Sequence, residues 1–229
     1  MERMVVLMSG GLNGVVAASR MLANVELHFL HVDYGQAAAK SERLAVARIS
    51  TALAGKLHVA DLPRFDRNGM PGPGGAVDAK RPTSNERVLE TRPSGVMLAI
   101  LALAQQLAAQ VGAEDIVCGA SEACSRSDAE AGFCSPAADG RRAFFHACSI
   151  ALEMGSPSAK RMSLELPFID VSREDIIRTG LRLGAPLPMT WSCHAGGEAP
   201  CGSCAGCRSR AAAFEMLGLD DPALAAATR

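Results

Sequence analysis

Short apolar runs alternate with longer segments of helical periodicity along this chain. The apolar runs predict strands at Met4–Met8, Leu27–Val32, Lys56–Asp61, Asp115–Gly119 and Ser163–Leu166. Apolar residues recurring every three to four positions predict helices at Leu12–Leu22, Ala37–Leu53, Gly95–Gln110, Arg141–Met154, Ser172–Leu183 and Ser209–Leu217. Because this alternation is typical of βαβ units, we predict an α/β fold with a parallel sheet, and ligands at the carboxyl ends of its strands.

Two segments fit neither pattern. Residues 64–87 are rich in glycine, proline and charge and predict a long loop, and residues 120–139 are polar and turn-rich. The predicted organisation is a main α/β domain over residues 1–186, followed by a small cysteine-rich region over residues 187–229.

Composition narrows the choice of partners and location. The net charge is −1, so no basic surface indicates nucleic-acid binding. The longest apolar stretch, Val96–Ala104, is too short to span a membrane, and Met4–Met8 is too short for a secretion signal. We therefore expect a cytoplasmic protein, in whose reducing surroundings cysteines stay free or bind metal.

Four of the eight cysteines lie within fifteen residues, as Cys193-x7-Cys201-x2-Cys204-x2-Cys207. Thiolates two residues apart on glycine-containing turns can converge on one tetrahedral ion, which favours a structural zinc. A disulfide framework, an iron–sulfur cluster and chance clustering are the alternatives. His194 is a possible ligand or a neighbour of the site.

A second motif follows the first predicted strand: Ser9-Gly10-Gly11-Leu12-Asn13-Gly14. A strand that passes through Ser-Gly-Gly directly into a helix presents free backbone N–H groups and the positive end of the helix dipole, which suit phosphates. The Walker and Gly-x-Gly-x-x-Gly motifs are absent. The alternative is a plain glycine-rich turn in which Asn13 caps the helix.

Taken together, these motifs resemble the 7-cyano-7-deazaguanine synthases of the PP-loop ATP-pyrophosphatase superfamily, over nearly the whole length and in order. The resemblance rests on Leu7–Leu12 as the pyrophosphate loop, Asp33-Tyr34-Gly35-Gln36 after the second strand, and Thr190-Trp-Ser-Cys193 with the three later cysteines. Arg208-x-Arg210-Ala-x-x-Phe214 and Gly218-x-x-Asp221-Pro222 match the family's ending.

The resemblance implies the adenine nucleotide alpha hydrolase-like (PP-loop) fold and an ATP-dependent C–N ligase of queuosine biosynthesis. Such enzymes activate the carboxylate of 7-carboxy-7-deazaguanine with ATP and Mg²⁺, convert the acyl-adenylate to an amide with ammonia, and dehydrate the amide to a nitrile. It also implies a homodimer that holds zinc through Cys193, Cys201, Cys204 and Cys207.

Residue by residue, the resemblance implies catalytic roles for Asn13, Arg92 and Arg173. The nucleotide-binding residues that it implies are Leu7, Ser9, Gly10, Gly11, Leu12, Asn13, Gly14, Asp33, Tyr34, Gly35 and Gln36. Asp33 is equally well explained as a helix cap, and Arg92 as an isolated structural arginine.

Four departures from the family pattern surround the expected reaction site. Asn13 and Gly14 stand where the family has Asp-Ser, and Arg173 stands where it has lysine. Glu90-Thr-Arg92-Pro93 replaces Pro-Gly-Arg-Asn, and Phe133-Cys134-Ser135 replaces Tyr-Pro-Asp.

Other residues have two readings each. Glu122, Ser125 and Asp128 are either ligands or ordinary loop residues. Phe133, Phe144 and Phe145 either stack on a heterocycle or pack in the core. Trp191 is expected beside the zinc loop. Three functions stay open: the family reaction or a close variant, activation of another carboxylate, and nucleotide or partner binding with weak catalysis.

Overall fold

The computed structural model describes residues 1–21, 24–63, 95–123, 138–156 and 161–227. Arg92 and residues 125, 128 and 133–135, which the sequence marks as candidates, lie outside these ranges. No helix among the described residues reaches the length and apolar character needed to cross a bilayer.

The described strands form one parallel sheet of five strands in the order β3-β2-β1-β4-β5. They are β1 (Glu2–Leu7), β2 (Val25–Asp33), β3 (Lys56–Asp61), β4 (Asp115–Val117) and β5 (Ser163–Glu165). The expected parallel α/β sheet is therefore confirmed.

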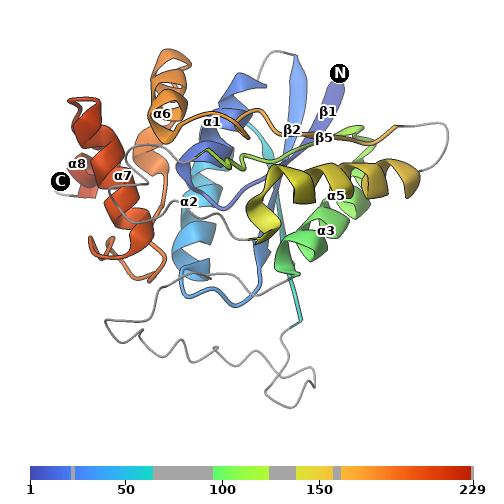
Figure 1. Ribbon diagram of the computed structural model, residues 1–229, viewed down its shortest axis with the longest axis horizontal. Coiled ribbons are helices and arrows are strands. Elements are labelled where there is room, and N and C mark those ends of the chain that lie inside the picture. Colours follow the sequence, from blue (N-terminus) through green and yellow to red (C-terminus); the bar gives the residue numbers. More distant parts are fainter. Residues whose placement is uncertain (22–23, 64–94, 124–137, 157–160, 228–229) are drawn as a thin grey trace.

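Helices cover both faces of the sheet (Figure 1). One face packs against α1 (Leu12–Arg20), α2 (Ala39–Ala52), α6 (Arg173–Arg182) and α7 (Ala205–Met216). The other face packs against α3 (Val96–Val111) and α5 (Arg142–Met154). The short elements η1 (Ala138–Gly140), η2 (Leu187–Met189) and α8 (Pro222–Ala227) complete the fold.

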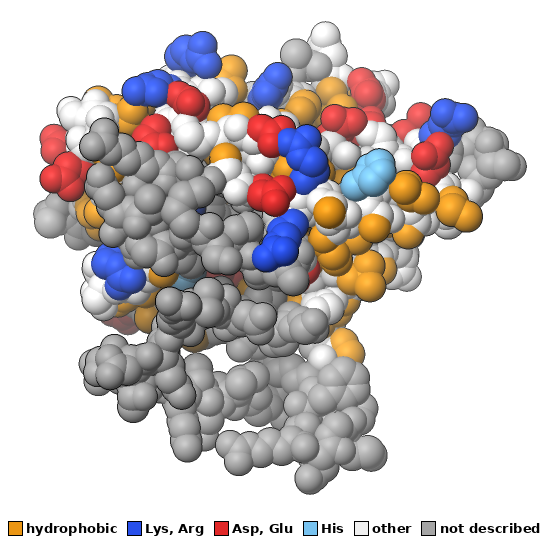
Figure 2. All heavy atoms as spheres, in the orientation of Figure 1, with side chains coloured by type: hydrophobic (Ala, Val, Ile, Leu, Met, Phe, Trp, Pro, Cys, Tyr) orange, Lys and Arg blue, Asp and Glu red, His pale blue; other side chains and the backbone are white. Residues whose placement is uncertain are grey.

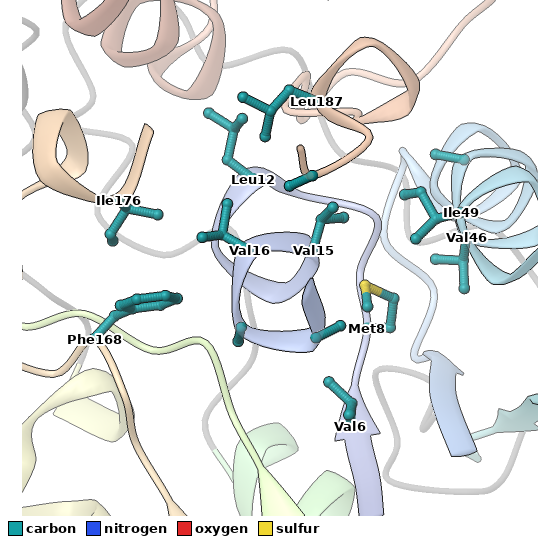
Figure 3. Packing of buried hydrophobic residues seen from close by; sticks show 14 of the residues in the cluster. Val6, Met8, Leu12, Val15, Val16, Val46, Ile49, Phe168, Ile176 and Leu187 are labelled. Carbon is teal, nitrogen blue, oxygen red and sulfur yellow. The ribbon is translucent and has the colours of Figure 1, made fainter. Parts of the chain in front are cut away.

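Helix α1 is the centre of the first core layer. Its Leu12, Val15 and Val16 pack in one cluster with Val6 of β1 and with Met8, the residue after β1, and lie between α2 on one side and α6 on the other (Figure 3). A Cβ built on Gly180 of α6 would lie 2.7 Å from Val16 Cγ2, so these two helices cross closely. The start of α1 is thus fixed by packing on several sides.

The chain order of the strands reverses beside β1. From β1 the chain moves outward to β2 and β3, and it later returns to place β4 on the opposite side of β1. In parallel α/β sheets, a crevice opens at the carboxyl ends of the strands where this reversal occurs, and ligands bind there. The loop after β1 lies at that point.

Most differences from the predicted elements are at their ends. The strand predicted at Asp115–Gly119 stops at Val117, and the last predicted helix begins at Ala205 instead of Ser209, because Cys204 caps it. Helix α8 was not predicted. The domain division after residue 186 stays a prediction; Ala213 and Phe214 belong to the same buried cluster as α1.

Candidate functional site

A cavity of about 410 Å³ lies at the carboxyl end of the sheet, at the reversal of strand order. Its walls come from the loop between β1 and α1, the end of β2, the segment after β4, helix α3, and the region around the four cysteines. The lining residues from the predicted nucleotide site are Leu7, Ser9, Gly11, Leu12, Asn13, Gly14, Tyr34 and Gln36, and Arg173 also lines it.

The loop after β1 makes a sharp turn into a helix start that has no side-chain cap, a geometry that suits an anion. Gly10 has a φ of +80°, and a Cβ added there would meet Ala45 Cβ at 3.0 Å and Glu42 O at 3.2 Å. Glycine at this position therefore lets the loop turn sharply against α2. Gly11 is the N-cap of α1 without a side-chain cap, so the first amides of α1 keep free N–H groups for a ligand.

Asn13 does not cap the helix, in contrast to the alternative drawn from the sequence, because the N-cap is Gly11. Its Oδ1 is buried and has no hydrogen-bond partner among the described residues, and the residue lines the cavity. Gly119, after β4, lies directly against it: a Cβ there would be 2.8 Å from the carbonyl carbon of Asn13. The backbone of Asn13 is thus closely packed, and its side-chain Oδ1 is an acceptor without a partner among the described residues.

The end of β2 forms a hydrogen-bonded turn beside this loop. Asp33 Oδ1 accepts from Gly35 N at 2.8 Å, and Gln36 Oε1 accepts from Tyr34 N at 2.9 Å. Gln36 Nε2 donates to Glu42 Oε2 at 2.8 Å. Asp33 therefore shapes the turn and does not cap α2, whose N-cap is Ala38.

Glu42 is the only carboxylate among the described lining residues. Burial raises its pKa, and the hydrogen bond from Gln36 acts in the opposite direction. Arg173 is the only arginine or lysine among the described lining residues, and it occupies the first position of α6. A guanidinium at a helix N-terminus reinforces the attraction that the helix dipole exerts on an anion.

The four cysteines converge on one point. Their Sγ atoms all lie within 4.8 Å of one another, and the Sγ atoms of Cys193 and Cys204 are 4.0 Å apart. Tetrahedral zinc with Zn–S bonds of about 2.3 Å requires sulfur atoms roughly 3.8 Å apart, so the cluster fits such an ion. Among the described residues, His194 is not part of this group.

Backbone amides surround the sulfur atoms. Cys201 N, Cys204 N and His194 N donate to Sγ atoms of the cluster at 3.3, 3.3 and 3.4 Å respectively. The backbone N–H of Ser203, more than any other neighbour, lowers the pKa of Cys201 to about 6, whereas burial raises the pKa of Cys193 and of Cys207. A bound cation would stabilise the thiolates that burial disfavours.

The cysteine region is hydrogen-bonded to the loop between β1 and α1. Trp191 N donates to Gly10 O at 2.8 Å, and Trp191 Nε1 donates to Cys193 O at 2.7 Å. On the far side, Ser41 Oγ of α2 donates to Gly197 O at 2.7 Å. Trp191 therefore lies beside the cysteine loop, as expected, and joins it to the cavity.

A buried ion pair supports the same segment. Arg210 Nη2 donates to Asp221 Oδ1 at 2.8 Å, and both side chains are largely buried. Arg210 Nη1 also donates to Thr190 Oγ1 at 2.7 Å and to Ser192 Oγ at 3.2 Å. Ser192 lines the cavity, so the buried pair Arg210–Asp221 helps to hold this part of the lining in place.

Three other candidates have mainly structural contacts. Glu122 Oε2 accepts from Arg142 N at 2.7 Å, at the start of α5. Phe144 and Phe145 pack edge to face with centroids 5.5 Å apart; Phe145 is fully buried and also reaches the cavity.

Sequence reasoning missed several cavity residues. His31 and Glu42 line it and were not predicted. Ser192 and His194 also line it, although the sequence placed them only in the cysteine region. A histidine inside an apolar strand and a glutamate on a helix carry no local signal of a site. Only their neighbours in the folded chain distinguish them.

Comparisons with known proteins identify the family of this chain. The sequence profile of the family described as queuosine biosynthesis protein QueC matches residues 3–218. A 7-cyano-7-deazaguanine synthase of Chlorobium phaeobacteroides is 31% identical over 228 residues, covering 96% of this chain and 95% of its own. One of Methanothrix thermoacetophila is 32% identical over 231 residues, covering 97% and 98%.

A solved structure of the U34-tRNA thiolase NcsA from Methanococcus maripaludis with its [4Fe-4S] cluster aligns with a TM-score of 0.49 at 10% identity. The alignment covers 92% of this chain and 63% of that one.

Proposed function

Because this chain belongs to the QueC family of queuosine biosynthesis proteins, we propose that it is an ATP-dependent ligase that activates a heterocyclic carboxylate as an acyl-adenylate. The substrate is 7-carboxy-7-deazaguanine or a close relative. Ammonia converts the adenylate to an amide, and a second activation dehydrates the amide to a nitrile. The observation that carries the proposal is the cavity in which the Ser9–Gly14 loop and Arg173 line the same space.

In the proposed first step a carboxylate oxygen attacks the α-phosphorus of ATP, an acyl–phosphate bond forms, and pyrophosphate leaves. Ammonia then attacks the carbonyl carbon, loses a proton and displaces AMP, which carries away the original carboxylate oxygen. The free amides at Ser9–Gly14 and the guanidinium of Arg173 suit the charge that builds on pyrophosphate as it leaves. Tyr34, Gln36 and the end of β2 are proposed to hold the nucleoside.

Mg²⁺ would neutralise part of the phosphate charge when bound. At position 13, where the family pattern has a carboxylate, the loop of this chain offers the neutral Oδ1 of Asn13. We therefore propose that 7-carboxy-7-deazaguanine is turned over slowly, or that the reaction stops at the amide.

The four cysteines are proposed to hold a structural zinc ion. Their thiolates supply a complete tetrahedral set, which leaves no position for substrate, as in structural zinc sites. Through Trp191, this site would hold the loop carbonyl of Gly10 in place. The zinc would therefore order the cavity without taking part in the reaction.

We also propose a cytoplasmic homodimer. All described cysteines are free, which suits a reducing compartment. Helix α3 contains no charged residue, and Leu98 of α3 and Ile150 of α5 are 53% and 47% exposed. Figure 2 shows apolar side chains grouped over α3 and α5 on the right of the view. Light scattering of the parent and of Leu98→Glu tests whether this face joins two copies.

The activity is tested by measuring AMP and pyrophosphate release from ATP, with 7-carboxy-7-deazaguanine and ammonia, and identifying the product by mass spectrometry. Slow amide formation supports the proposal, and rapid nitrile formation shows that Asn13 does not limit the reaction. AMP release only with another carboxylate would show that the substrate differs from that of the family. This is the second candidate function, and the changes at Asn13 and Gly14 are the observation that favours it. No AMP with any acid favours a binding protein.

A further inference from the structure

His31 is one of the residues that line the cavity, and the second nitrogen of its imidazole ring has no partner among the described residues. The residue lies near the carboxyl end of β2, two positions before Asp33, and is 1% exposed. Its Nδ1 is 3.1 Å from the backbone carbonyl oxygen of Met8, at the start of the loop between β1 and α1. Its Nε2 is buried and has no hydrogen-bond partner among the described residues.

The contact with Met8 decides which nitrogen carries the hydrogen. A carbonyl oxygen can only accept, so Nδ1 must donate, and the hydrogen is on Nδ1. Burial is the largest influence on the ring and lowers its pKa, which favours the neutral form, whereas the hydrogen bond to Met8 O acts in the opposite direction. Asp33, Arg43 and Asp61 exert weaker and opposing influences. In the neutral ring Nε2 therefore bears a lone pair and is an acceptor.

A buried acceptor without a donor is rare in folded proteins, and a residue that lines a ligand cavity can have such an atom satisfied by a group of the ligand. A phosphate oxygen at neutral pH offers no hydrogen, so phosphate does not satisfy this nitrogen. The nucleoside half of ATP does carry donors, on the ribose hydroxyls and the exocyclic amine. If phosphates bind the amides at Ser9–Gly14, the nucleoside must lie close by, and His31 adjoins that loop through Met8.

We propose that His31 Nε2 accepts a hydrogen bond from the nucleoside of the bound ATP and thereby helps to select the nucleotide. The inference rests on the proposed use of ATP. The donor is either a ribose hydroxyl or the 6-amino group, and the two are separated by ligands that lack one at a time.

The experiment is calorimetry of the full chain, with ATP, 2′-deoxyATP, 3′-deoxyATP and the purine triphosphate that lacks the 6-amino group. The parent is compared with His31→Leu and His31→Phe, which remove the acceptor. His146→Leu, at an exposed position of α5, is the matched control. Thermal melting is measured for every variant, and only variants that keep a cooperative transition are used.

The expected result is that the parent binds one analogue roughly three- to tenfold more weakly than ATP, the effect of one hydrogen bond. In the His31 variants the affinity for ATP should fall to the affinity that the parent has for that analogue. The affinity of the variants for the analogue should equal that of the parent. The missing group then identifies the donor. His146→Leu should keep the parent's discrimination.

Two results overturn the inference and leave the proposed function standing. One is a parent that binds all three analogues as tightly as ATP, which needs no variant to be folded. The other is a folded His31 variant that retains the parent's discrimination. A parent that binds none of the four nucleotides overturns the proposed function itself.

Discussion

At the scale of single residues, Asn13 is the position where this chain differs most directly from its expected chemistry. Asn13 lines the cavity, and its Oδ1 is buried without a partner among the described residues. The amide supplies the shape and the acceptor of a carboxylate but lacks the charge that would bind a metal strongly. The neighbouring Gly14 is tightly packed, since an added Cβ would lie 3.3 Å from both Leu7 O and Met8 Sδ.

Asn13→Asp should therefore raise the rate of AMP formation. One charge-assisted contact in a desolvated site contributes about 1.5–3 kcal/mol, which corresponds to roughly one to two decades in rate. The measurement is single-turnover AMP release with Mg²⁺. Asn13→Ala, which removes the acceptor without adding charge, is the control and should give no gain. An aspartate variant no faster than the parent would show that this position does not bind the metal. Because Gly14→Ser must also find space for its side chain, the single substitution is the cleaner test.

At the scale of elements, the turn from β1 into α1 is the part that we propose to bind phosphate. Gly11 differs from Gly10 in that a Cβ there would meet Ser9 Oγ at 3.4 Å and Trp191 O at 3.7 Å, which are ordinary contacts. A methyl group therefore fits at Gly11, and a charge can be added there without a steric clash at its Cβ.

This allows a matched pair of variants. Gly11→Asp places a carboxylate where the phosphates are expected and should weaken ATP binding by more than about tenfold, whereas Gly11→Ala should stay within about threefold of the parent. Calorimetry measures both, and melting curves check that both are folded. Equal ATP affinity in the parent and Gly11→Asp would contradict the assignment of the loop.

The elements themselves were largely predictable. The strands are short apolar runs and the helices carry apolar residues at 3.6-residue spacing, and both patterns are local. The N-terminal start of α7 was missed because its cap is the thiol of Cys204, and helix caps are usually recognised by hydroxyl and carboxylate side chains.

The site could be predicted only where its residues form a motif along the chain. The glycines after β1, the turn after β2 and the cysteine spacing all do so. His31 does not, because strand pairing brings it to the loop at Met8. Ser192 belongs to the motif before the first cysteine of the cluster, but its place at the cavity depends on the contact with Arg210. Such contacts depend on the whole fold.

At the scale of the molecule, the cysteine region and the α/β sheet are joined at the cavity. The contacts through Trp191, Gly197 and the pair Arg210–Asp221 run from the cysteines to the loop, to α2 and to α7. A metal that orders the cysteines should therefore stabilise the fold and improve nucleotide binding together.

Cys204→Ser separates the metal from the helix cap. Cys204 Sγ also accepts from Cys207 N at the start of α7, and a serine hydroxyl can keep that role while losing the thiolate. We expect zinc loss and, for about 3 kcal/mol of lost ligation, a fall in Tm of roughly 6–12 °C. Metal analysis and melting curves measure both.

The control for this variant is His194→Gln, which should retain one zinc per chain. A chelator should lower the Tm of the parent but not that of Cys204→Ser. Loss of zinc in His194→Gln, or a parent that contains no zinc, would contradict the four-sulfur site.

The central claim is that a substrate carboxylate is activated by direct bonding to the α-phosphorus of ATP, and oxygen tracing tests it most directly. The parent is incubated with ATP, Mg²⁺, ammonia and 7-carboxy-7-deazaguanine labelled with ¹⁸O in both carboxylate positions, and AMP is analysed by mass spectrometry. The account predicts one ¹⁸O in each AMP, with the second label retained in the amide, or transferred to a second AMP when nitrile forms. Substrate-dependent AMP without ¹⁸O, or release of ADP and phosphate instead, would contradict it.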